Sequence, residues 1–126
     1  MKQPPLLSSS SYKSLIENEP AQAIFEAAVV QAVNDILSTL GENAKETIYS
    51  HLKNSYGINK EEIPSKIEAF ANAIEETFGV VGKLIEIKII ERLHSQYKDF
   101  RYAPKNGKLD FVKYVTTLRN HLEPKA

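Results

Sequence analysis

Apolar residues recur with helical spacing in five segments of the chain. The first segment runs from Pro20 to Leu40 and ends before Gly41. Proline suits the first position of a helix, and this segment is apolar over much of its circumference. Such a helix is either the centre of the monomer or a seam shared with a second chain. The candidate contacts of a dimer or partner seam, spaced three or four residues apart, are Val30, Val33, Leu37 and Leu40.

The second and third helical segments have similar starts and ends. Each is expected to end at a glycine, Gly57 or Gly79, because glycine adopts the left-handed conformation at little cost. The apolar residue after it, Ile58 or Val80, can then fold back on the helix. Each segment also starts with a polar residue that is followed three positions later by glutamate, as in a capping box. The two pairs are Asn43 with Glu46 and Ser65 with Glu68.

The last two helical segments cover residues 81–97 and 109–122. The first of them is so dense in leucine and isoleucine that we expect it to be the most buried helix. Its β-branched residues would also suit a strand, but its charged residues do not alternate as a strand requires. In the second, one face consists of apolar residues, namely Phe111, Val115, Leu118 and Leu122. Pro104 and the Asn106-Gly107 pair predict a loop between the two helices.

These segments predict an all-α fold, a compact bundle of about five helices. Residues 20–126 are expected to form a single helical domain. Residues 1–19 are expected to be a disordered tail, because two prolines and four consecutive serines offer little apolar surface to offset the entropy of ordering.

Composition excludes several classes of site. The chain has no cysteine, which rules out disulfides, a thiolate nucleophile and cysteine-based metal centres. No apolar run approaches the roughly 20 residues of a membrane span. The N-terminal segment also lacks the long apolar stretch of a signal peptide, so we expect a cytoplasmic protein without a membrane partner.

Charge is balanced overall but divided along the chain. Sixteen basic and sixteen acidic residues give zero formal net charge, which argues against a generic polyanion binder. Residues 41–79 carry four lysines against seven glutamates, whereas residues 80–126 carry ten basic residues against five acidic ones. The two halves can attract each other within a monomer or across a dimer, or the basic half can face an acidic partner.

Reactive residues do not form a recognisable site. The three histidines, His51, His94 and His121, fall on three different predicted helices without the paired spacing of a metal site. The paired glutamates are adjacent in sequence, so they point apart instead of converging across a cleft. Ser50 and Ser55 lie near His51, but no oriented base or nucleophile elbow accompanies them. We therefore expect no catalytic residues, no metal and no cofactor.

Residues 97–114 interleave aromatic and basic side chains. Cations beside stacking aromatics are typical of proteins that bind single-stranded nucleic acid. The candidate contacts to an anionic partner are Lys98, Arg101, Lys105 and Lys108. Alternatively, Tyr97, Phe100 and Phe111 anchor a loop to the core and leave the lysines at its solvated rim.

Residues 40–93 resemble a known family. The matching segments are LGENAKETIYSHLKNSYGI, EEIP, AFANAIEETFG and GKLIEIKIIERL. In the spacing of their glycines, proline and aromatics they are similar to the Nitrosopumilus output domain family, small archaeal domains associated with signal transduction. The resemblance implies a cytoplasmic archaeal regulatory protein, without catalytic residues to carry over. We expect a non-enzymatic signalling output or protein–protein interaction module, a homodimer or bound to a protein partner, with a nucleic-acid-binding regulator as the alternative.

Overall fold

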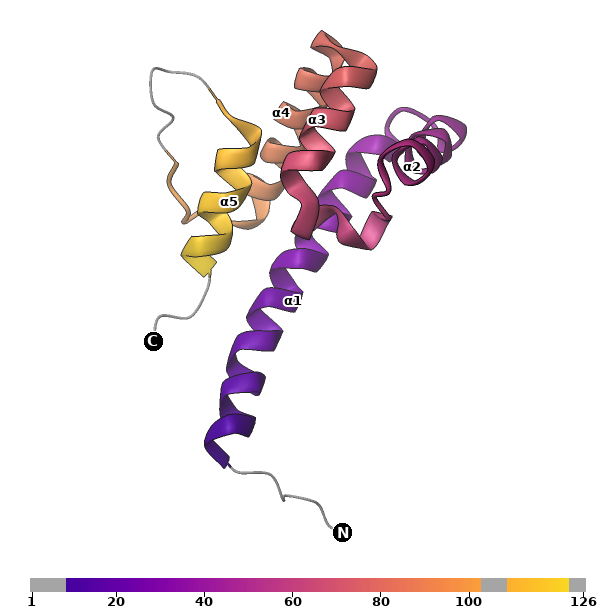
Figure 1. The fold of residues 1–126 in the computed structure, drawn as a ribbon. Coiled ribbons are helices and arrows are strands. Elements are labelled where there is room, and N and C mark those ends of the chain that lie inside the picture. The colour runs from indigo at the N-terminus through magenta and orange to yellow at the C-terminus, as the bar shows by residue number, and fades with distance from the viewer. Residues whose placement is uncertain (1–8, 103–108, 123–126) are drawn as a thin grey trace.

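The computed structural model describes residues 9–102 and 109–122, with side chains from residue 21 onward. These residues form five packed α-helices and one short 3-10 helix, with no strand in these ranges. Figure 1 shows how the helices are arranged. The all-α bundle is therefore confirmed. The elements are α1 (Ser9–Ser38), α2 (Glu42–Tyr56), η2 (Lys60–Lys66), α3 (Ile67–Phe78), α4 (Val80–Gln96) and α5 (Phe111–Leu122).

The first helix starts eleven residues earlier than the sequence predicts. Helix α1 begins at Ser9 and has Pro20 in its interior, whereas the sequence predicts a start at Pro20. Good helix formers such as Lys13, Leu15 and Glu17 precede the proline, and extending an existing helix is easier than nucleating one. Residues 1–8, the rest of the expected tail, lie outside the described residues.

The core is built around the second half of α1. This helix contacts α2, η2, α4 and α5, and Figure 1 shows its earlier half extending beyond the other helices. Its buried residues, spaced as one helical face, are Phe25, Val29, Ala32, Val33 and Leu37. Helix α1 therefore lies at the centre of the monomer, which is one of the two positions expected for it.

The two glycine ends form at the expected residues. Gly57 has φ 66° and ψ 28°, the left-handed conformation, and its N–H donates to the Lys53 carbonyl. Ile58 is buried and its N–H donates to the carbonyl of Leu52, as the fold-back required. Gly79 has φ 57° and ψ −127°, a different positive-φ conformation that lets α3 turn directly into α4.

Three of the expected end contacts are wrong. Asn43 does not cap α2, because this helix already begins at Glu42 and Gly41 is its N-cap without a side-chain hydrogen bond. Ser65 does not cap α3, because η2 runs straight into that helix. The capping box instead joins Asn59 and Glu62 at the start of η2. Val80 does not fold back on α3, because it is the first residue of α4 and 78% exposed.

Helix α4 has six buried residues, and it also carries aliphatic residues that its neighbours leave exposed. One face packs into the core, mainly against α1 and α3. Gly82 brings the backbones of α3 and α4 together, since a Cβ atom built there would lie 2.6 Å from the Ile74 carbonyl oxygen. Four aliphatic residues remain exposed on the other side: Val80, Val81, Leu84 and Ile87. Because α4 is so rich in apolar residues, it has more apolar surface than the neighbouring helices cover.

Candidate binding surface

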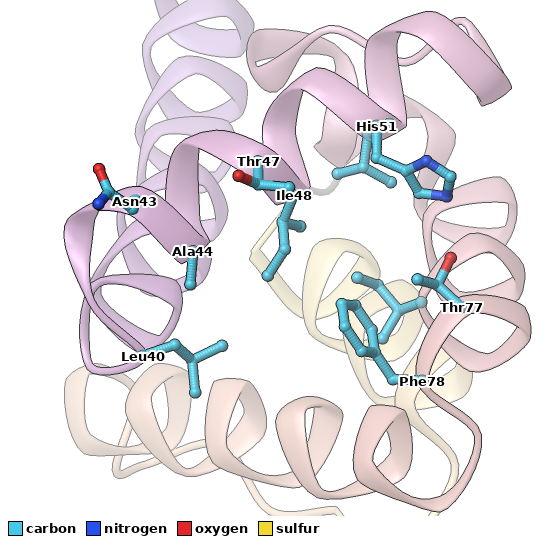
Figure 2. A pocket seen from close by; sticks show the side chains of 10 residues that line it. Leu40, Asn43, Ala44, Thr47, Ile48, His51, Thr77 and Phe78 are labelled. Atoms are coloured by element: carbon cyan, nitrogen blue, oxygen red, sulfur yellow. The ribbon is translucent and has the colours of Figure 1, made fainter.

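An apolar groove lies between α2 and the end of α3. It has a volume of about 520 Å³, and Figure 2 shows its walls, with Ile48 on α2 facing Phe78 on α3. Its ten lining residues are Leu40, Asn43, Ala44, Thr47, Ile48, His51, Leu52, Ile74, Thr77 and Phe78. This volume falls within the range typical of ligand and partner sites, and most of the lining is aliphatic or aromatic.

The polar groups around the groove are neutral or weakly basic. They come from Asn43, Thr47 and His51 on α2 and from Thr77 on α3, all of which are exposed. None of the ten lining residues is a carboxylate, lysine or arginine. The groove is thus suited to apolar side chains with a few hydrogen bonds at its edge.

A ridge of exposed aliphatic side chains lies beside the groove. We define the ridge as Val80, Val81 and Leu84, which are 78%, 53% and 53% exposed. It follows Phe78, a wall of the groove, after the single residue Gly79. Gly82, in the middle of this segment, packs on Ile74, which also lines the groove. The ridge therefore starts two residues after Phe78, the end of the groove wall formed by α3.

The C-terminal end of α1 connects the ridge to the groove on its other side. Helices α1 and α4 pack together and run in opposite directions in Figure 1, and Asp35 is bound to Arg92 at 2.9 Å. Thr39 and Lys88 line one shallow depression farther along this contact. Leu40 is the residue after Thr39, and Leu84 lies one helical turn before Lys88. In Figure 2, Leu40 points toward the ribbon of α4.

The predicted seam residues do not share one surface. Val33 and Leu37 are 0% exposed within the single chain, so they have no area left for a partner. Val30 is half-buried, and Leu40 is exposed and lines the groove. Of the four residues, Leu40 alone belongs to the apolar surface described above. The predicted seam did not include α4. The reason is that periodicity shows which residues share a face of a helix but not which face a neighbouring helix covers.

The aromatic residues of segment 97–114 pack inward. Phe100, Phe111 and Tyr114 are buried, and the ring of Phe100 meets that of Tyr114 edge-on at 5.5 Å. Tyr102 lies on the same cluster, 5.4 Å from the ring of Tyr114. His121 also contacts it, with its ring 5.1 Å from that of Phe100. These contacts hold the segment to the core, as the alternative interpretation expected.

The basic candidates of this segment are only partly described. Lys98 and Arg101 are exposed, and Lys105 and Lys108 lie outside the described residues. The buried rings leave few aromatic faces beside these cations on which bases could stack. This arrangement does not favour the single-stranded nucleic acid interpretation.

Histidines do not converge in the described part of the chain. His51 lies 3.3 Å from the Ser55 hydroxyl and meets the Tyr56 ring edge-on. His121 packs on Phe100, at the far end of α5 from Phe111. Within residues 9–102 and 109–122, no three histidine or carboxylate side chains are grouped as a metal site would require.

One carboxylate cluster escaped the sequence analysis. Glu86 on α4 is only 3% exposed and forms a hydrogen bond with Glu75 of α3. Lys83 lies 3.2 Å from Glu75, and Asp110 before α5 contributes a further negative charge. Burial, followed by the hydrogen bond and charge of Glu75, raises the pKa of Glu86 to about 8. None of these residues lines the groove.

Comparisons with protein families, with curated proteins and with solved structures found no match. The similarity to the Nitrosopumilus output domain family therefore stays a prediction. Among the described residues, no helix is both long enough and apolar enough to span a membrane.

Proposed function

We propose that this chain is a non-enzymatic helical interaction module that binds a protein partner through the groove and the ridge. The observation that carries this proposal is the exposure of three neighbouring aliphatic side chains, Val80, Val81 and Leu84, beside an apolar groove. Exposed apolar surface that is contiguous and rimmed by polar residues is typical of protein interaction sites. The signalling output role of an archaeal cytoplasmic protein rests on the family resemblance alone.

The chemistry of the surface supports binding over catalysis. The groove is lined by apolar side chains, by the polar side chains of asparagine and threonine, and by His51. The carboxylate with a strongly raised pKa, Glu86, is buried between α3 and α4 and does not line it. A reactive group would have to reach a bound molecule to act on it, and the groove offers such a molecule mainly hydrophobic contact.

The proposal is tested by comparing partner capture by three forms of the chain. Tagged wild type, Leu84→Glu and Ile24→Glu are used to capture proteins from a native lysate, followed by mass spectrometry. Ile24 is the matched control, because it is 63% exposed and lies fourteen residues, or about 21 Å of helix, before the end of α1 at Ser38.

We expect wild type and Ile24→Glu to capture the same proteins and Leu84→Glu to lose them, because a charge in the ridge must be desolvated on binding. Circular dichroism should show equal helix content in all three forms. Capture of one unchanged set of proteins by all three would contradict a role for this surface.

A further inference from the structure

We infer that the partner on this surface is a second copy of the chain, arranged so that the ridge of each copy fills the groove of the other. This inference rests on the proposed function and names the occupant of its binding surface. In such an isologous pair the same two surfaces meet twice, related by a two-fold axis. The pair would therefore cover both ridges and both grooves at once.

The ridge itself argues for this occupant over a small apolar ligand. A ligand in the groove would cover Ile48 and Phe78 but leave Val80, Val81 and Leu84 in water. Removing exposed aliphatic surface from water is favourable by roughly 25 cal/mol per Å². An occupant that covers ridge and groove together gains more than one that covers the groove alone. A second copy provides one ridge for this groove and one groove for this ridge.

The groove is large enough to hold two aliphatic side chains of another copy. An engineered apolar cavity of about 150 Å³ holds one benzene molecule. The groove has about 520 Å³, and its lining already includes Leu40, Ile48 and Phe78. It therefore has room for Val81 and Leu84 of another copy, with Thr47 and Thr77 at the rim.

Charges beside the two surfaces are complementary. Helix α3, one wall of the groove, carries three acidic residues and no basic one: Glu68, Glu75 and Glu76. Glu75 is already paired with Lys83 of the same copy at 3.2 Å. Glu76, next to the lining residue Thr77, has no ion pair among the described residues. On α4, Lys88 lies one helical turn beyond Leu84 on the same face and is exposed. No ion pair of Lys88 is found among the described residues. Bringing Lys88 of one copy to Glu76 of another places positive beside negative charge, which favours this orientation.

Cysteine cross-linking tests the arrangement directly, because the chain has no native cysteine. We would make Val81→Cys in the ridge and Thr47→Cys at the groove rim, both exposed positions, with tags of different mass. The two chains are oxidised separately and as a mixture. Ile24→Cys, mixed with Thr47→Cys, serves as the control. A disulfide forms where the two Cα atoms approach within about 7 Å.

We expect the mixture of Val81→Cys and Thr47→Cys to form cross-linked dimers several-fold faster than either chain alone and than the control mixture. Light scattering of the wild type should give a dimer, and Leu84→Glu should raise its dissociation constant at least tenfold. Salt should weaken the dimer, because part of the attraction is between exposed charges.

Two results would overturn the inference, and both are distinguishable from failure of the proposed function. Faster cross-linking of Val81→Cys with itself would mean that ridge packs on ridge. A wild-type monomer at high micromolar concentration would exclude the second copy.

If Leu84→Glu still loses captured proteins in the lysate experiment, the interaction surface stands and its occupant is another protein. Binding of a fatty acid by the monomer would point to a small ligand instead.

Discussion

Replacing Glu86 with glutamine should remove a large part of the pH dependence of folding stability. Glu86 is 3% exposed and hydrogen-bonded to Glu75, and its Oε2 atom has no hydrogen-bond partner among the described residues. Burial is the main cause of its raised pKa of about 8, and the charges of Glu75 and Asp110 add to it. Lys83 acts in the opposite direction. The folded protein therefore holds this carboxyl in its protonated form at neutral pH.

The sign of the effect follows from the two states of the chain. In the unfolded chain Glu86 has its ordinary pKa of 4.5, and in the folded chain a pKa of about 8. Between these values the folded state binds more protons, so the free energy of unfolding falls as pH rises. The stability contributed by the protonated carboxyl is complete below about pH 4.5 and is lost by about pH 8.

The effect of Glu86 on stability is large enough to measure over a narrow pH range. Each pH unit inside the window changes the free energy of unfolding by at most about 1.4 kcal/mol for one group. From about pH 6 to about pH 7.5 the wild type should therefore lose at most about 2 kcal/mol through Glu86. Glu86→Gln keeps the shape and a hydrogen-bonding oxygen but carries no charge at either pH, so it should not show this loss.

Urea unfolding followed by circular dichroism at both pH values measures the difference. The decisive quantity is the difference in unfolding free energy between wild type and Glu86→Gln at each pH, because all other titratable groups are common to both proteins. We expect the gap to shift in favour of the variant by up to about 2 kcal/mol as the pH rises. Glu91→Gln, an exposed position on the same helix, is the control and should leave the slope unchanged. A gap that stays constant between the two pH values would refute the reasoning.

Three further predictions concern backbone geometry and charge. Gly57→Ala should destabilise the fold by about 1–2 kcal/mol in thermal melts through left-handed strain alone, since its Cβ would meet nothing within 4 Å. Gly82→Ala should cost about 1–3 kcal/mol in the same melts, because its Cβ would overlap the Ile74 carbonyl. Unchanged melting temperatures would contradict both. Wild type and Lys105→Glu with Lys108→Glu should both fail to bind single-stranded DNA, duplex DNA or RNA at low salt; salt-sensitive binding lost in the double variant would revive the nucleic acid alternative.

The sequence alone determined the number, type and most boundaries of the helices. Gly57 and Gly79 end α2 and α3 as predicted, because a positive φ angle is a local requirement that glycine meets whatever surrounds it. The charge spacing in α4 likewise separated helix from strand in spite of its β-branched residues. The early start of α1 and the actual capping residues were missed, because several residues near each end can start a helix almost equally well.

Only the tertiary structure decided which residues are buried and which are free to bind. Val33 and Leu37 look like seam residues in the sequence, but neighbouring helices enclose them in one chain. Leu84 looks like core, yet α4 offers more apolar surface than α1, α3 and α5 cover. Glu86 sits among regularly spaced charges and becomes buried through the close approach of α3 at Gly82. Periodicity specifies a face of each helix, whereas packing between segments distant in sequence determines what that face meets.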